Sequence, residues 1–315
     1  MFDQILGNEQ IKAYLTKACL ENRLGSTLLF SGPDGVGKRL FANALAAHLL
    51  KAPLSRIEQN NHPDFHVLHP EGKSGVYPIE KIRSMIDEGH VAPFESSCKV
   101  FVLEDAERMQ LASANALLKT LEEPLDGVAF ILLTSQPKEI LPTILSRCTV
   151  LSFQPLREKE IAELLDSKGH PARLAKLSNG SAGRAFEEAL HPEFQEQRKI
   201  LFSLLRSNPS FLNLSSDLEK LEKLIISDRE EDPVASSKRA ARLFGDILMW
   251  MRDQTLRKLC PEKKEFLFFP DELPCEYQLP SMALVEKTID EVKSALLRNM
   301  KLSICLQRLF FKLFV

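Results

Sequence analysis

The stretch TLLFSGPDGVGKRLFANALAAHLL, residues 27–50, decides the fold of the first half of this chain. It runs from a short apolar strand pattern, Thr27–Phe30, through a glycine-rich loop into a helical pattern over Arg39–Leu50. A strand, a G-x-x-x-x-G-K loop and a helix in this order predict a phosphate-binding loop. The backbone N–H groups of such a loop and the N-terminus of the helix attract phosphate oxygens. The alternative is a glycine-rich turn that only connects a strand to a helix.

One position of the loop departs from the pattern of an active ATPase. Gly32, Gly35 and Gly37 supply the turn, and Lys38 is placed to reach the β- and γ-phosphates. Arg39 stands where a serine or threonine hydroxyl normally ligates Mg²⁺, and a guanidinium has no electron pair to offer a metal. The sequence is therefore compatible with a loop that holds ATP or ADP beside a weakened Mg²⁺ site.

A second pair of residues bears on the same metal position. The stretch KVFVLEDAERM, residues 99–109, is an apolar strand pattern that ends in Glu104 and Asp105. Active sites of this type use Asp followed by Glu, to hold Mg²⁺ and to activate the attacking water, and here the order is reversed. The reversal moves each carboxylate by about one methylene, and catalytic geometry is sensitive to shifts of about 1 Å. Acids that only cap the strand and open a helix are the alternative interpretation.

Apolar runs rich in β-branched residues alternate with helical patterns along the first half of the chain. This alternation predicts an α/β fold with a parallel five-stranded sheet that helices cover on both faces. The runs are Thr27–Phe30, Phe65–Leu68, Lys99–Leu103, Ala129–Thr134 and Thr149–Phe153. Beyond Pro155 the β signal ends and helical patterns follow, so we expect a sheet domain over 1–156, a small helical domain over 157–206 and an all-α domain over 207–315.

The composition excludes several classes of protein. The 315 residues have a net charge of −2, whereas a dedicated sequence-reading DNA-binding protein usually has a basic surplus. No apolar run reaches the roughly 18 residues of a membrane span, and the N-terminus has no signal-peptide pattern, so we expect a cytoplasmic protein without a membrane partner. The six scattered cysteines include no C-x-x-C pair, which predicts reduced thiols and no zinc site.

Three histidines lie close together in NHPDFHVLHPE, residues 61–71. On a strand, His62 and His66 would point to one face and His69 to the other. A shared metal centre would be poorly served by this arrangement. We therefore expect no metal site there.

Two further motifs resemble the clamp-loader branch of the AAA+ family. They are NALLKTLEEP at 115–124 and LLTSQPKEILPTILSRC at 132–148. The stretches FDQILGNEQIKAYL (2–15), LSNGSAGRA (177–185) and LRNMKLSICLQRLFFKL (297–313) match the same branch in order. The resemblance implies an AAA+ domain, a helical lid domain and a C-terminal collar through which subunits form a ring.

The resemblance also implies roles for individual residues. Ser135, or its neighbour Thr134, falls at sensor 1, a polar group near the γ-phosphate. Arg147 falls at the arginine finger, which would act in trans on ATP bound by a neighbouring subunit. Arg184 falls at sensor 2 on the lid, with a solvated or helix-capping arginine as the alternative.

The resemblance implies a function in DNA replication, as a subunit of an ATP-dependent clamp loader that places a sliding clamp on primed DNA. Because the metal side of the loop is altered, we expect a non-motor subunit and no enzyme activity from the chain alone. The implied partners are the gamma and tau motor subunits and the delta subunit, and through the complex the beta clamp and primed DNA at replication forks on the nucleoid. An active motor ATPase of the same complex is the alternative, and a P-loop kinase fits the helical second half badly.

The last helical pattern of the chain has a stripe of apolar residues at spacings of three and four. The stripe alone leaves two interpretations open, a core within the chain or a contact between collar subunits. Its members are Leu302, Leu306, Leu309, Phe310 and Leu313.

Overall fold

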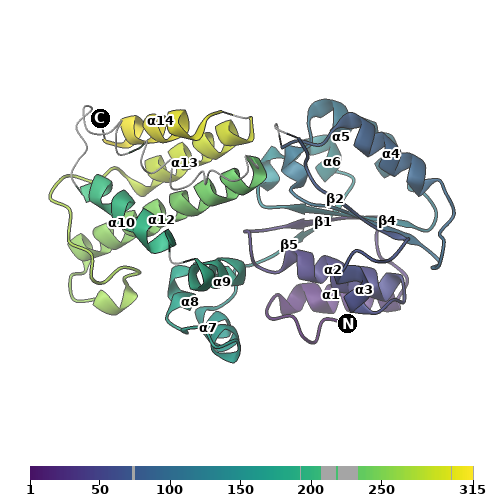
Figure 1. Ribbon diagram of the computed structural model, residues 1–315, viewed down its shortest axis with the longest axis horizontal. Helices are drawn as coiled ribbons and strands as arrows, with labels where there is room; N and C mark the ends of the chain where they lie inside the picture. The colour runs from purple at the N-terminus through teal and green to yellow at the C-terminus, as the bar shows by residue number, and fades with distance from the viewer. Residues whose placement is uncertain (73–74, 192, 207–217, 219–232, 299, 315) are drawn as a thin grey trace. The chain divides into compact units, whose positions relative to one another are not determined.

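The computed structural model (Figure 1) describes residues 1–72, 75–191, 193–206, 218, 233–298 and 300–314. The chain divides into two compact units, Met1–Leu190 and His191–Val315. Most of the beginning of the predicted third domain, residues 207–217 and 219–232, lies outside the described residues. The predicted domain boundaries near 156 and 206 remain predictions.

The first unit is built around a sheet of five parallel strands in the order β2-β3-β4-β1-β5 (Figure 1). Every residue of β1 and β3 is buried, as expected for central strands covered on both faces. Each strand predicted from the sequence lies within one residue of the observed one. The strands are β1 (Thr27–Ser31), β2 (Phe65–Leu68), β3 (Lys99–Leu103), β4 (Val128–Thr134) and β5 (Thr149–Ser152).

Helices cover both faces of this sheet (Figure 1). The apolar side chains form a buried cluster on each face, one around Phe41 and the other around Phe101. The helices on the first face are α1 (Glu9–Leu20), α2 (Lys38–Leu49) and α3 (Leu54–Glu58), and those on the second are α4 (Ile79–Gly89), α5 (Leu111–Glu122) and α6 (Pro142–Leu145).

Three short helices complete the first unit. They are α7 (Glu158–Ser167), α8 (Leu174–Leu177) and α9 (Ala182–Leu190). Their apolar residues form a small cluster of their own, which includes Leu156 and the fully buried Ile161. This group of helices therefore has a small apolar core of its own.

Among its described residues, the regular secondary structure of the second unit is helical, and residues 260–281 form a largely irregular segment. Its helices are α10 (Glu193–Arg206), α12 (Pro233–Leu259), α13 (Met282–Leu297) and α14 (Leu302–Phe314). The apolar stripe of α14 is buried within the chain, from Leu302 at 7% exposure to Leu306 and Leu309 at 0%. This burial decides between the two interpretations: the stripe belongs to the hydrophobic core of the chain. Across the described residues, no helix has both the length and the apolar character that crossing a membrane requires.

Candidate nucleotide-binding site

The polar ends of three neighbouring strands meet at one edge of the sheet. Ser31, at the end of β1, pairs with Thr134 at the end of β4, and Leu103, at the end of β3, pairs with Leu132. In a parallel sheet the carboxyl ends of the strands share one edge, where ligands of α/β proteins bind. The glycine-rich loop, the acids after β3 and Ser135 are therefore brought to the same edge, as the sequence motifs predict.

The glycine-rich loop has the backbone conformation for which its glycines are needed. Helix α2 begins at Lys38, and its N-cap Gly37 has a φ of 100°. Gly35 has a φ of 73° and Gly32 a φ of 156°. A Cβ on Gly32 would lie only 2.6 Å from the carbonyl oxygen of Phe153, so a side chain cannot be accommodated there.

Lys38 is folded back onto the loop from which it projects. Its Nζ donates hydrogen bonds to the carbonyl oxygens of Gly32, at 2.6 Å, and Pro33, at 2.8 Å. The carboxylate of Asp34 lies 3.7 Å from the same ammonium. The side chain of Lys38 is only 9% exposed, so its charge is compensated inside the loop.

Arg39 spans the distance from α2 to the end of β3. Its Nε donates to Oδ1 of Asn43 at 2.8 Å, and its Nη1 forms an ion pair with Oε1 of Glu104. The other carboxylate oxygen of Glu104 lies 3.0 Å from Nδ1 of His69. Burial alone would raise the pKa of Glu104, but the hydrogen bonds and charges of His69 and Arg39 outweigh it and lower that pKa to about 2.

These residues do not fit a magnesium ion in the arrangement observed. Mg²⁺ requires oxygen ligands in octahedral geometry, whereas Arg39 offers only donors and both oxygens of Glu104 already have partners. Asp105 lies in the left-handed region with a φ of 49°, at the N-cap of a short 3₁₀ helix, Ala106–Arg108. Within the described parts of the chain, no cluster of three or more His, Cys, Asp or Glu side chains could hold a metal.

Glu107 is a residue of this site that the sequence motifs did not reveal. It is 9% exposed, and its Oε1 accepts hydrogen bonds from the backbone N–H of Ser135 at 3.3 Å and from the hydroxyl of Ser135 at 2.9 Å. Burial raises the pKa of Glu107. The available signal was a third acid, three residues after Glu104, but only the fold shows that it reaches the predicted sensor 1 position.

The first turn of α9 packs against the glycine-rich loop. The backbone N–H of Gly183 donates to the carbonyl oxygen of Gly35 at 3.0 Å. A Cβ on Gly35 would lie 2.3 Å from Oγ of Ser181, so the contact depends on glycine. Arg184 follows directly, and its backbone N–H donates to Oγ of Ser181 at 3.1 Å. The structure therefore brings the helix that carries Arg184 to the loop.

Arg147 lies apart from this cluster of polar strand ends, between α6 and β5. Its Nη1 donates to the carbonyl oxygen of Thr143 at 2.9 Å and to Oγ of Ser146 at 3.1 Å. Its Nη2 lies 2.5 Å from Oε1 of Glu122, the last residue of α5. The hydrogen bonds of this guanidinium are thus made to α5, α6 and the residue before it, at the exposed surface.

The three neighbouring histidines make separate contacts. His62 and His69 lie outside β2, which covers only Phe65–Leu68, so the expectation that His62 and His66 share a strand face was wrong. His66 stacks on the ring of Phe101 with centroids 4.8 Å apart, and His69 contacts Glu104. The short strand explains the difference, because the residues before it form a turn that ends at Asp64.

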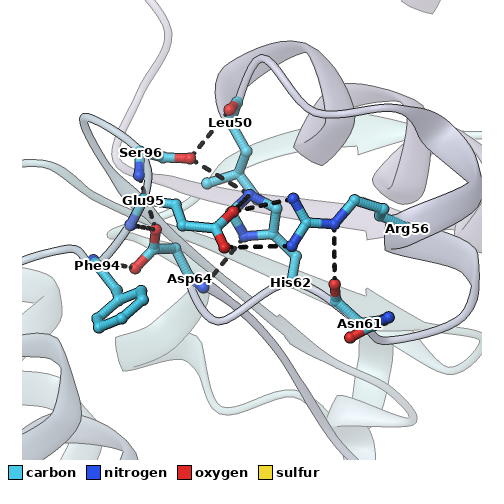
Figure 2. A network of polar contacts seen from close by, with 8 residues as sticks. All are labelled: Leu50, Arg56, Asn61, His62, Asp64, Phe94, Glu95 and Ser96. Atoms are coloured by element: carbon cyan, nitrogen blue, oxygen red, sulfur yellow. Dashed lines mark hydrogen bonds and ion pairs between the residues drawn. The ribbon is translucent and has the colours of Figure 1, made fainter.

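His62 belongs to a buried polar network around Asp64 (Figure 2). Nδ1 of His62 accepts from the backbone N–H of Asp64 at 3.2 Å. The carboxylate of Asp64, at 0% exposure, accepts from the backbone N–H groups of Phe94 at 2.6 Å and of Glu95 and Ser96 at 2.8 Å each. Burial opposes ionisation here, but these donors hold the pKa of Asp64 below its ordinary value. The network is a brace for the loop before β3.

Comparison with known proteins gives consistent matches. A family model described as "DNA polymerase III, delta subunit" matches residues 7–157. The delta-prime subunit of DNA polymerase III from Bacillus subtilis is 35% identical over 200 residues, which cover 58% of this chain and 60% of the relative. The delta-prime subunit from Yersinia pestis is 35% identical over 237 residues, which cover 71% of this chain and 64% of the relative.

A tau/gamma subunit and a solved structure also match. The tau/gamma subunit from Haemophilus influenzae is 34% identical over 202 residues, which cover 57% of this chain and 29% of the relative. A DNA polymerase III gamma subunit-related protein from Thermotoga maritima, solved at 2.00 Å, is 18% identical, with a TM-score of 0.44 and coverage of 96% of this chain and 97% of that chain. The matched residues span less than two thirds of each of these curated relatives. The chain is therefore similar to the delta-prime subunits of DNA polymerase III.

Proposed function

We propose that this chain is a non-motor subunit of a bacterial clamp loader and donates Arg147 to the ATP site of a neighbouring subunit. The contrast between two arginines supports the proposal. Arg39 and Glu104 fill the metal position of the chain's own loop, whereas the guanidinium of Arg147 lies at the surface. An exposed arginine can stabilise the charge that develops on a phosphoryl group bound by another chain.

The complex would use ATP to load a sliding clamp onto primed DNA. The neighbours of this chain would be gamma or tau motor subunits and the delta subunit, and the beta clamp and DNA would be reached through the assembled complex in the cytoplasm. Contact with DNA would be made mainly to phosphates, so loading should weaken as salt concentration rises.

The second unit would serve as the collar in which subunits pack. Since the apolar stripe of α14 is used inside the chain, the contact between subunits needs other residues. Ile304 and Phe311 are 49% and 37% exposed and lie seven positions apart, on one face of α14. Among the side chains of α14 that the structure describes, these two are the exposed apolar positions that the helix would offer to a neighbouring collar.

The decisive experiment is hydrolysis by a reconstituted complex that carries Arg147→Ala. We expect hydrolysis at the neighbouring site to fall about 10³-fold, as for other arginine fingers, while gel filtration shows that the complex still assembles. Arg157→Ala is the matched control, because Arg157 is 83% exposed and also pairs with a glutamate, Glu160, at 2.7 Å. Unchanged hydrolysis with Arg147→Ala would contradict the proposed role of Arg147 at the neighbouring ATP site.

A motor ATPase of the same complex is the second candidate. It is favoured by the intact loop glycines and Lys38, by the acids Glu104 and Asp105 at the strand end, and by Ser135 and Arg184 at the positions of the two sensors. The test is Mg²⁺-dependent hydrolysis by the purified chain, with Lys38→Ala as the control. Turnover that depends on Lys38 would support the motor and contradict the non-motor assignment.

A further inference from the structure

One side chain connects the two positions between which a metal would lie. Arg39 directly follows Lys38 in α2, and its guanidinium pairs with Glu104 at the end of β3. In a metal-dependent P-loop site, these positions supply the hydroxyl and the carboxylate on either side of Mg²⁺. The chain therefore carries a cation of its own at the place where the residues do not fit the metal.

The contacts of Arg39 leave part of its guanidinium available. Nε is held by Asn43 at 2.8 Å, and Nη1 is held by Glu104. Nη2 has no hydrogen-bond partner among the residues that the structure describes, and the side chain is 29% exposed. The planar guanidinium is thus oriented by two contacts on one side, while its remaining N–H groups can bind an anion.

The loop in front of Arg39 keeps the features that a phosphate requires. Its three glycines have positive φ angles, and α2 begins at Lys38, directly after the loop. Lys38 contacts carbonyl oxygens of the same loop at 2.6 and 2.8 Å, which a phosphate oxygen can replace as acceptors. Guanidinium binds phosphate through paired, charge-assisted hydrogen bonds and needs no metal to do so.

We propose that Arg39 replaces the magnesium ion, so that this loop binds the polyphosphate of a nucleotide without a divalent cation. Lys38 and Arg39 supply the positive charge, and the loop N–H groups supply the remaining donors. Glu104 holds the guanidinium in position and is not a metal ligand. The proposal goes beyond the action of Arg147 on a neighbour and does not depend on it.

The test is calorimetric titration of the full chain with ATP and with ADP, in Mg²⁺ and in EDTA. We expect Kd to differ by no more than about twofold between the two conditions. Arg39→Thr restores the hydroxyl of a metal-dependent loop, and its Kd in EDTA should rise about tenfold to a hundredfold, as expected for the loss of a charge-assisted hydrogen bond. Arg39→Lys keeps the charge and should lose less, whereas Lys38→Ala should abolish binding.

Three results would overturn the proposal. They are no binding to the native chain, binding at least about tenfold weaker in EDTA than in Mg²⁺, and an Arg39→Thr protein that binds in EDTA as the native chain does. Circular dichroism checks the fold of each variant. If Arg39→Thr does not fold, the comparison of the native chain with and without EDTA still decides. A negative outcome leaves the role of Arg147 intact, because hydrolysis at a neighbour's site measures that role.

Discussion

Two arginine–glutamate pairs of the first unit use the same chemistry with different consequences. Arg39 and Glu104 have side chains 29% and 22% exposed, and His69 and Asn43 complete their hydrogen bonds. Arg147 and Glu122 are 33% and 49% exposed, and water can replace either partner. In our proposals, the first pair occupies the metal position of the chain's own loop, and the second leaves an arginine available to another chain.

Asp64 is a third carboxylate for this comparison, and it is completely buried. Its carboxylate is inaccessible to water and is compensated by three backbone N–H groups instead of an arginine (Figure 2). Because charges are worth more as water is removed, the contribution of a carboxylate to stability should decrease from Asp64 through Glu104 to Glu122. Contributions to activity should follow a different order, since they depend on what each arginine can reach.

Lysine substitutions at Arg147 and Arg39 should give the largest difference in the rate of ATP hydrolysis at the neighbouring site. Arg147→Lys should lower hydrolysis at the neighbouring site about a hundredfold, because lysine keeps the charge and loses the planar fork of donors. Arg39→Lys should change the same rate by no more than about twofold, because it faces the chain's own loop. Single-turnover hydrolysis by the reconstituted complex measures both. Equal losses would show that the two sites do not have the separate roles proposed for them.

The largest effect on stability is expected at the buried carboxylate. Asp64→Asn places an amide against backbone N–H donors, and it should cost about 1–3 kcal/mol of unfolding free energy. Denaturation followed by circular dichroism measures the loss, and hydrogen exchange at residues 94–96 should accelerate. Trp250, the single tryptophan, is buried in the second unit, so its fluorescence is an internal control. Unchanged exchange in the loop would contradict the role of Asp64 as a brace.

Glu104 should make the stability of the first unit depend on pH in the acid range. Its pKa of about 2 in the folded chain lies below its ordinary value of 4.5, so the folded state binds this proton less readily than the unfolded state. The stabilisation is therefore complete above about pH 4.5 and is lost as the pH falls toward about 2. Glu104→Gln should cost about 1 kcal/mol at neutral pH and flatten this dependence. An identical acid profile in the variant would rule out the linkage.

The smallest effect is expected at the exposed pair. Glu122→Gln should change the unfolding free energy by no more than about 0.5 kcal/mol, since exposed ion pairs contribute little. Glu123→Gln, at the next and also exposed position, is the matched control. Thermal unfolding compares the two variants. A loss as large as that of Asp64→Asn would mean that exposure does not determine how much each carboxylate contributes to the unfolding free energy.

Much of the first unit could be predicted from local sequence. The strands were placed within one residue because buried parallel strands are short, continuous apolar runs between helical patterns. The loop glycines could also be predicted locally, because residues other than glycine rarely adopt their φ angles. Helices α1 and α4 were not specified, because an amphipathic surface helix without a motif has only a weak local signal.

Most residues of the candidate site can be named from the sequence, but their pairing cannot. Arg39 and Glu104 were each recognised as departures from a metal site, yet they are 65 positions apart, and nothing local indicates that one neutralises the other. Glu107 was missed for the same reason, because its partner Ser135 is 28 positions away, directly after β4. The stripe of α14 was likewise ambiguous until burial showed it to be core.

The sequence by itself determined the strands and the glycine-rich loop, because the apolar runs of strands and the conformation of glycines depend on neighbours in the chain. The tertiary structure decided which charges meet, because the order of the strands brings β1, β3 and β4 to one edge. Electrostatic interactions depend on distance and exposure, which no local pattern encodes. The same residue type therefore pairs with Glu104 beside the glycine-rich loop at Arg39 and lies at the surface at Arg147.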